Sequence, residues 1–128
     1  MADLGAVEAR LRALLAPYRG DLVEAPIYGL TVLRRPGAKA HDWFAGIQPV
    51  DGAVKLNFLP MHRHPEVLGG ASAALLKRRT GASVFRFTAL DEALAAEVAT
   101  VLARGFEVYM AAEGGGDPDR ADRRLGAD

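Results

Sequence analysis

Two histidines and a glutamate at alternate positions form the most suggestive chemical pattern in the chain. The pattern is His62-x-His64-x-Glu66, within the segment of residues 60–70. In an extended segment, alternate side chains point the same way, so two imidazoles and a carboxylate would share one side. This ligand set suits zinc or iron(II), so iron or zinc is the cofactor that these residues would hold. The competing interpretation is an irregular polar loop, in which Pro65 disturbs extended geometry.

Basic residues gather at two places along the chain. Each place has three, one set in a loop after an expected strand and one at the end of an expected short helix (Arg34, Arg35, Lys39; Lys77, Arg78, Arg79). If the fold brings the two sets together, they would form a site for an anionic ligand. The alternative is ordinary solubilising charge, with the second set complementing the helix dipole.

Polar side chains on the expected strands form a third candidate site. Lys55, Asn57 and Arg86 lie on strands opposite large apolar residues, and Tyr28 and Trp43 are expected nearby. A ligand site usually combines apolar surface with a few convergent polar groups. We therefore predict that Tyr28, Trp43, Lys55, Asn57 and Arg86 form a polar sheet-face pocket for a small ligand or a partner. The alternative is a solvated sheet face whose charged side chains lay their stems along it.

The catalytic motifs that a sequence can reveal are missing from this one. There is no Gly-x-Ser-x-Gly pattern, and the serines Ser72 and Ser83 fall at an expected helix start and in an expected strand. The glycines at 114–116 are not followed by Lys-Ser or Lys-Thr, so a flexible linker describes them better than a phosphate loop. We predict a non-enzymatic binding or accessory protein, with no catalytic residues. An enzyme stays an alternative, because general acid–base catalysis needs only one or two placed groups.

Composition restricts the class of protein. The chain has 128 residues and is 50% apolar, which is enough for one domain with a substantial core. It has no cysteine, which excludes thiol catalysis, disulfides and thiolate zinc sites and fits a reducing compartment. Sixteen Lys and Arg residues balance 16 Asp and Glu residues, and a neutral chain argues against a dedicated nucleic-acid binder.

The sequence also bears on location and partners. Residues 1–11 lack the basic start and the continuous apolar run of a signal peptide. No apolar stretch approaches the roughly 18 to 20 residues that would span a bilayer. A cytoplasmic protein without a membrane partner is therefore expected. Its partner is predicted to be a small molecule or a protein, with a homodimer left open.

Hydrophobic periodicity predicts an alternation of helices and strands. The expected elements are a helix over 4–15, strands over 27–33, 42–48 and 53–59, an irregular connection over 60–70, a short helix over 71–79, a strand over 83–88 and a helix over about 91–110. The Asp51-Gly52 pair makes 42–59 a hairpin. Consecutive strands joined by short turns favour an antiparallel meander. The expected fold class is α+β, with an antiparallel sheet of about four to five strands and N- and C-terminal helices packed on one face.

The end of the chain differs in composition from the rest. From Glu113 onward it contains glycines, a proline and alternating Asp and Arg, and Leu125 is its one apolar residue larger than alanine. Such a segment cannot bury enough surface to offset the entropy of ordering it. We therefore expect a flexible tail over 113–128 and a single domain over 1–112.

Several segments match the elements of a known family. They are residues 22–30 (Leu-Val-Glu-Ala-Pro-Ile-Tyr-Gly-Leu), 43–45 (Trp-Phe-Ala), 54–58 (Val-Lys-Leu-Asn-Phe) and 81–87 (Gly-Ala-Ser-Val-Phe-Arg-Phe). With the first helix they resemble the YdhG-like family, also called domain of unknown function 1801, over roughly residues 4–110. The resemblance implies a compact α+β domain, no assigned activity for most members, and a frataxin-like iron chaperone role for some. The chain departs from that role in its first helix, which has no acidic ridge and sets Asp3 and Glu8 against Arg10 and Arg12.

Overall fold

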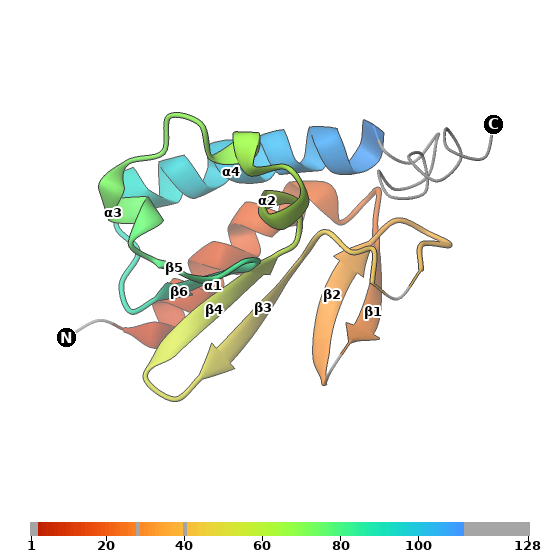
Figure 1. Cartoon of the computed structure of the whole chain (residues 1–128). Coiled ribbons are helices and arrows are strands. Elements are labelled where there is room, and N and C mark those ends of the chain that lie inside the picture. The colour runs from red at the N-terminus through yellow and green to blue at the C-terminus, as the bar shows by residue number, and fades with distance from the viewer. Residues whose placement is uncertain (1–2, 28, 40, 112–128) are drawn as a thin grey trace.

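The computed structural model describes residues 3–27, 29–39 and 41–111 (Figure 1). Its elements in chain order are α1 (Leu4–Leu15), η1 (Ala16–Tyr18), β1 (Val23–Ile27), β2 (Leu30–Arg34), β3 (Ala45–Val50), β4 (Ala53–Phe58), α2 (Pro60–Arg63), η2 (Pro65–Leu68), α3 (Ala73–Leu76), β5 (Arg79–Gly81), β6 (Val84–Phe87) and α4 (Glu92–Ala111). No helix within these residues is long and apolar enough to cross a membrane. The expected tail over 113–128 lies outside the described residues.

The strands form one antiparallel sheet of six in the order β1-β2-β3-β4-β6-β5. Figure 1 shows α1 and α4 on the same side of this sheet. The α+β class, the antiparallel sheet and the terminal helices are confirmed. The expected four to five strands are too few, because the periodicity missed β1 and β5. The YdhG-like identity of this fold remains a prediction.

The first missed strand shows why the count was low. Residues 27–33 were expected as one strand, but Gly29 has φ +78° and separates β1 from β2. Pro26 lies inside β1. A proline disfavours a strand in sequence-based prediction, because it has no N–H to donate to a neighbouring strand. The topology makes β1 an edge strand, so one side of it needs no partner.

Two further predictions, for residues 60–70 and 71–79, were wrong. The segment expected as an irregular connection folds into α2 and η2, each with a proline in its first turn, where a missing N–H costs nothing. The expected helix over 71–79 is only the single turn α3, capped by the Ser72 hydroxyl. Arg79, the last residue of the expected helix, belongs to the short strand β5.

The core lies between the helices and one face of the sheet. The apolar stripes of α1 and α4 pack on Phe44 and on alternate residues of β4 and β6, in one cluster that runs from Val7 to Tyr109. Gly105 on α4 lets this helix approach Phe58 closely, since a Cβ at Gly105 would lie 2.1 Å from the ring atom Cζ of Phe58.

A buried polar network fixes the connection between β2 and β3. The Arg35 guanidinium donates to the carboxylate of Asp42 and lies 4.3 Å from the centroid of the Tyr109 ring. The Tyr109 hydroxyl accepts from the N–H of Arg35 at 2.9 Å and donates to the C=O of Asp42 at 3.0 Å. This network ties the connection to the C-terminal part of α4, directly before β3 begins.

Gly46 allows β2 and β3 to lie in close contact. A Cβ at this position would lie 2.6 Å from the backbone oxygen of Thr31 and 2.9 Å from Cγ1 of Val32. We expect Gly46→Ala to lower the free energy of unfolding by about 2 to 3 kcal/mol, because the obstructing atom is backbone and cannot rotate away. Urea denaturation measures the change. Gly20→Ala is the control, since nothing lies within 4 Å of its Cβ position, and an equal effect at both glycines would contradict the prediction.

Candidate ligand-binding face of the sheet

Basic residues from three neighbouring segments form one row across the sheet. Gln48 pairs with Lys55 between β3 and β4, and Lys55 pairs with Arg86 between β4 and β6. The N–H of Arg86 donates to the C=O of Arg78 at 2.7 Å, so Arg78, directly before β5, continues the row. Directly opposed residues of antiparallel strands place their side chains on the same face. We call Lys55, Arg86 and Arg78 the basic row.

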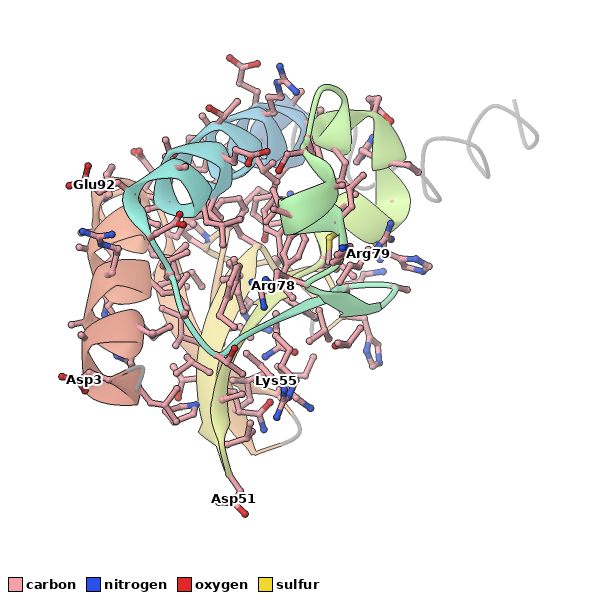
Figure 2. The ribbon with its side chains drawn as sticks, turned by 90° about the vertical axis from the view of Figure 1, so that its left-hand side faces the viewer. Asp3, Asp51, Lys55, Arg78, Arg79 and Glu92 are labelled. Carbon is pink, nitrogen blue, oxygen red and sulfur yellow. The ribbon has the colours of Figure 1, made fainter. Side chains whose placement is uncertain are left out.

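This row lies on the face of the sheet opposite the helices. Val54, Leu56 and Phe58 belong to the core, so Lys55 and Asn57, which alternate with them, point the other way. Figure 2 shows Lys55 and Arg78 on the side of β4 away from α1. The alternation that predicted this face from the sequence is confirmed.

Within the described residues, the basic row is not paired with any acidic side chain. Among the described residues, none of its three side chains forms an ion pair or donates a hydrogen bond, and Nε of Arg78 is buried without a partner. Like charges directly opposite each other in a sheet are destabilising, and a buried donor without an acceptor loses its hydration. An anion on this face would remove both costs.

Asn57 places an amide beside the basic row. It follows Lys55 by two residues on the same face, is 9% exposed, and its Nδ2 is buried without a partner. Across the strands it pairs with Gly46 and Val84. A buried amide nitrogen that donates to nothing is a ready donor for a ligand oxygen.

Arg34 adds a further buried donor on this side of the sheet. Val32 contacts the position that a Cβ of Gly46 would take, so Val32 lies on the same face as Asn57, the cross-strand partner of Gly46. Arg34 follows Val32 by two residues in β2 and shares that face. Its Nε is also buried without a partner.

The structure brings together three of the five residues predicted for this site. Lys55, Asn57 and Arg86 share the face, whereas Trp43 lines a separate small cavity with His64 and Tyr109, near α2 and the end of α4. Trp43 departs from the expected alternation because β3 begins only at Ala45. Tyr28 lies outside the described residues.

Gln48, Arg78 and Arg34 also belong to this face, although none of them was predicted there. The Asp51-Gly52 turn that predicted the hairpin also fixes the pairing of Gln48 with Lys55, so the position of Gln48 could have been predicted from the sequence. Arg78 was assigned to a helix end, because β5 has only three residues and no periodicity to mark it. Of the other basic set, Arg35 is buried in its pair with Asp42 and has a structural role.

The His-x-His-x-Glu segment does not have the extended geometry that was expected. His62 belongs to α2, His64 follows it, and Glu66 belongs to η2, so alternate side chains no longer share one side. Nδ1 of His64 and Oε2 of Glu66 lie 3.4 Å apart. In the described part of the chain, no three His, Asp or Glu side chains come close enough together to hold a metal ion.

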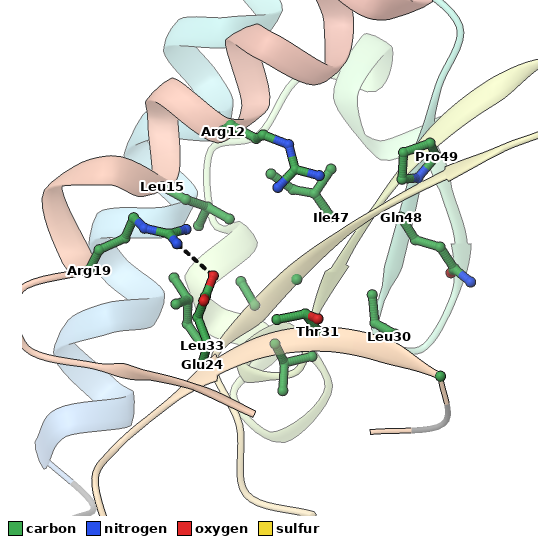
Figure 3. A pocket seen from close by; sticks show the side chains of 14 residues that line it. Arg12, Leu15, Arg19, Glu24, Leu30, Thr31, Leu33, Ile47, Gln48 and Pro49 are labelled. Carbon is green, nitrogen blue, oxygen red and sulfur yellow. Dashed lines mark hydrogen bonds and ion pairs between the residues drawn. The ribbon is translucent and has the colours of Figure 1, made fainter. Parts of the chain in front are cut away.

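A cavity of about 510 Å³ lies between β2 and β3 (Figure 3). Leu15, Leu33 and Ile47 line it with apolar surface, and Arg12 and Arg19 reach toward it from the α1 side. Arg19 is paired there with Glu24 at 2.6 Å. No local pattern of residues predicts this cavity, because it depends on how two strands diverge.

Comparisons of the chain with protein-family models, with curated proteins and with solved structures found no match. The resemblance to the YdhG-like family therefore rests on the sequence segments alone.

Proposed function

We propose that the protein is a non-enzymatic binding domain that holds a small anionic ligand on the sheet face opposite its helices. The observation that carries the proposal is the basic row, in which Lys55, Arg86 and Arg78 lie side by side without an acidic partner among the described residues. A ligand with phosphate or carboxylate groups would accept charge-assisted hydrogen bonds from all three.

The dimensions of the row favour a ligand with more than one anionic group. Adjacent strands lie about 4.8 Å apart, so the three side chains start from points that span about 10 Å. A guanidinium binds a phosphate or carboxylate through two parallel N–H groups, and an ammonium binds it as a point charge. Asn57 would then donate to an uncharged or partly charged oxygen at the side of the row. This arrangement supports a diphosphate or a polycarboxylate as the ligand class.

The alternative role in iron or zinc handling gains no support from the site geometry. His64 and Glu66 lie close together, but His62 does not complete a group of three with them. No observation favours a metal over an anion as the ligand of this domain.

Binding of small anions tests the proposal directly. We expect isothermal titration calorimetry at low salt to detect binding of pyrophosphate, citrate or ATP by the full chain. Lys55→Met and Arg86→Met should each weaken the affinity about tenfold, the usual effect of one lost charge-assisted hydrogen bond. Arg12→Met is the matched control, because it removes one positive charge from α1, on the other side of the sheet (Figure 2).

Three outcomes would contradict this prediction. The absence of binding by any of the three anions would remove the small-ligand role. An equal loss of affinity in Arg12→Met would show a non-specific charge effect. Binding of an acidic peptide in place of the small anions would assign the face to a protein partner.

The stability of the free protein provides a second, independent test. Without a ligand, Lys55→Met should raise the free energy of unfolding by about 0.5 kcal/mol, because it relieves repulsion from Arg86 directly opposite. The melting temperature should rise by about 2 °C at low salt, and the gain should shrink in 1 M NaCl, where charges are screened. Thermal unfolding followed by circular dichroism measures both. A lower melting temperature at low salt would argue that the row is already neutralised within the protein.

A further inference from the structure

Three buried side-chain atoms of the described residues have no hydrogen-bond partner, and all three belong to the sheet face that carries the basic row. They are Nε of Arg34, Nδ2 of Asn57 and Nε of Arg78. Each of these nitrogens carries hydrogen and can only donate. Buried polar atoms of folded proteins are nearly always hydrogen-bonded, so unpartnered donors gathered on one face favour a ligand that supplies acceptor oxygens.

Asn57 is the most enclosed of the three residues. It is 9% exposed, whereas the two arginines are half-buried. Its cross-strand partners, Gly46 and Val84, have no polar side chain that could accept from its amide. Val32, which contacts the Cβ position of Gly46, is 1% exposed and adds apolar surface. The amide of Asn57 therefore lies in a largely apolar part of the face and needs an acceptor that loses little on dehydration.

These surroundings favour an uncharged oxygen beside Asn57. A phosphate or carboxylate oxygen carries charge, and its burial beside a neutral amide costs more hydration than one hydrogen bond returns. A hydroxyl oxygen can accept, but its own hydrogen then needs an acceptor, and the unpartnered buried atoms found among the described residues are all donors. A carbonyl oxygen is uncharged and only accepts, so it matches the amide best.

The cations of the basic row lie to one side of Asn57. Lys55 precedes Asn57 by two residues in β4, so their side chains start about 7 Å apart. Nη2 of Arg86 lies 3.9 Å from the position that a Cβ of Gly52 would take, so this guanidinium reaches toward the β3–β4 turn, away from Asn57. The stem of Lys55 is flexible, and a chain of about five carbon atoms, at about 1.2 Å per bond, would bridge from its ammonium to Asn57.

We infer that the ligand of this face is an oxo dicarboxylic acid of about five carbons, and that Asn57 selects it by donating to its carbonyl oxygen. This assignment rests on the proposed anion-binding function and narrows its ligand class. Cations of the basic row would bind the two carboxylates through charge-assisted hydrogen bonds. Asn57 would then determine specificity without contributing charge.

Ligands that differ by one oxygen test this assignment on the unchanged protein. 2-Oxoglutarate and glutarate have the same carbon chain and the same two carboxylates, and 2-hydroxyglutarate has a hydroxyl in place of the carbonyl. We expect isothermal titration calorimetry at low salt to show at least tenfold tighter binding of 2-oxoglutarate than of either other acid, because a buried donor gains its acceptor. The side-chain amide signals of Asn57 should shift in ¹H–¹⁵N spectra with 2-oxoglutarate only.

Protein variants identify the residue responsible. Asn57→Leu removes the amide with little change in volume, and it should bind 2-oxoglutarate and glutarate equally, with the affinity of the unchanged protein for glutarate. Gln48→Leu is the matched control, because it removes an amide from the same face at a half-buried position opposite Lys55 and should keep the preference. Circular dichroism checks that both variants fold. The comparison of ligands on the unchanged protein decides the matter even if Asn57→Leu does not fold.

The possible failures can be told apart. Equal binding of 2-oxoglutarate and either comparison acid by the unchanged protein would overturn the assignment, as would a preference that persists in Asn57→Leu or is lost in Gln48→Leu. Binding of pyrophosphate without binding of 2-oxoglutarate would also overturn it and would leave the anion-binding function standing. The absence of binding of pyrophosphate, citrate, ATP and 2-oxoglutarate alike would contradict the anion-binding function itself.

Discussion

Replacing Asp42 by alanine is expected to lower the free energy of unfolding by about 3 to 5 kcal/mol. The Arg35 side chain that pairs with it is 6% exposed, so the substitution would leave a guanidinium buried without a carboxylate. Arg63 lies 3.8 Å from the same carboxylate and would lose its partner as well. Chemical denaturation with urea, followed by tryptophan fluorescence, measures the loss.

The rest of the network cannot replace the lost carboxylate. Arg35 also donates to the C=O of Tyr109 at 2.7 Å, and a carbonyl does not neutralise its charge. Burial raises the pKa of Tyr109 to about 12, so the hydroxyl stays protonated at neutral pH and cannot act as a counter-ion. The uncompensated buried charge of Arg35 therefore raises the free energy of the folded state and lowers the free energy of unfolding.

Two controls separate this effect from a general loss of negative charge. Asp51→Ala removes a carboxylate from the exposed β3–β4 turn and should change stability by less than about 0.5 kcal/mol. The double change Asp42→Leu with Arg35→Met removes both charges and should recover much of the lost stability. A single variant as stable as the unchanged protein would show that the ion pair contributes nothing.

Replacing Gly105 by alanine is expected to lower the free energy of unfolding by about 3 kcal/mol, against the usual preference of helices for alanine. The added Cβ would lie 2.1 Å from Cζ and 2.7 Å from Cε1 of Phe58, whose side chain is fully buried. The ring contacts Phe44 edge to face and has no exposed space into which to turn. The helix must therefore move away from the sheet, which opens the core.

Gly5→Ala is the matched control for this substitution. Gly5 also lies in a helix, but it is exposed, and the nearest atom to its Cβ position is a side-chain oxygen of Asp3 at 3.3 Å. That oxygen accepts from the N–H of Ala6 as the N-cap and needs to shift by only a few tenths of an ångström, so alanine there should change stability by less than about 1 kcal/mol. Urea denaturation of the two variants should show the large loss at Gly105 alone. An equal loss at both positions would mean that the Gly105–Phe58 contact does not limit the helix position.

These two contacts also position the candidate sites. The Arg35–Asp42 pair lies directly before β3, and the Leu33–Ala45 pair that follows is the point beside which the cavity between β2 and β3 opens. The Gly105–Phe58 contact holds α4 against β4, the strand whose opposite face carries Lys55. A variant that weakens either contact should therefore be tested for binding only where it remains folded.

Local patterns in the sequence determined the first and last helices, the central hairpin and the direction in which the side chains of β4 point. Lys55 and Asn57 alternate with Val54, Leu56 and Phe58, and the strand period of two then fixes one buried and one polar face. The Asp51-Gly52 turn fixed the register of β3 on β4. These features could be predicted because each depends on residues that are close in the chain.

Only the tertiary structure decided what completes the polar sheet face and what lies beside it. Arg78 joins Lys55 and Arg86 through a strand too short to show a period, and β1 is tolerated with its proline because it lies at an edge. The burial of Arg35 and the cavity beside Thr31 likewise depend on how distant segments meet. Such features arise from non-local pairing and packing, and no local pattern of residue types encodes them.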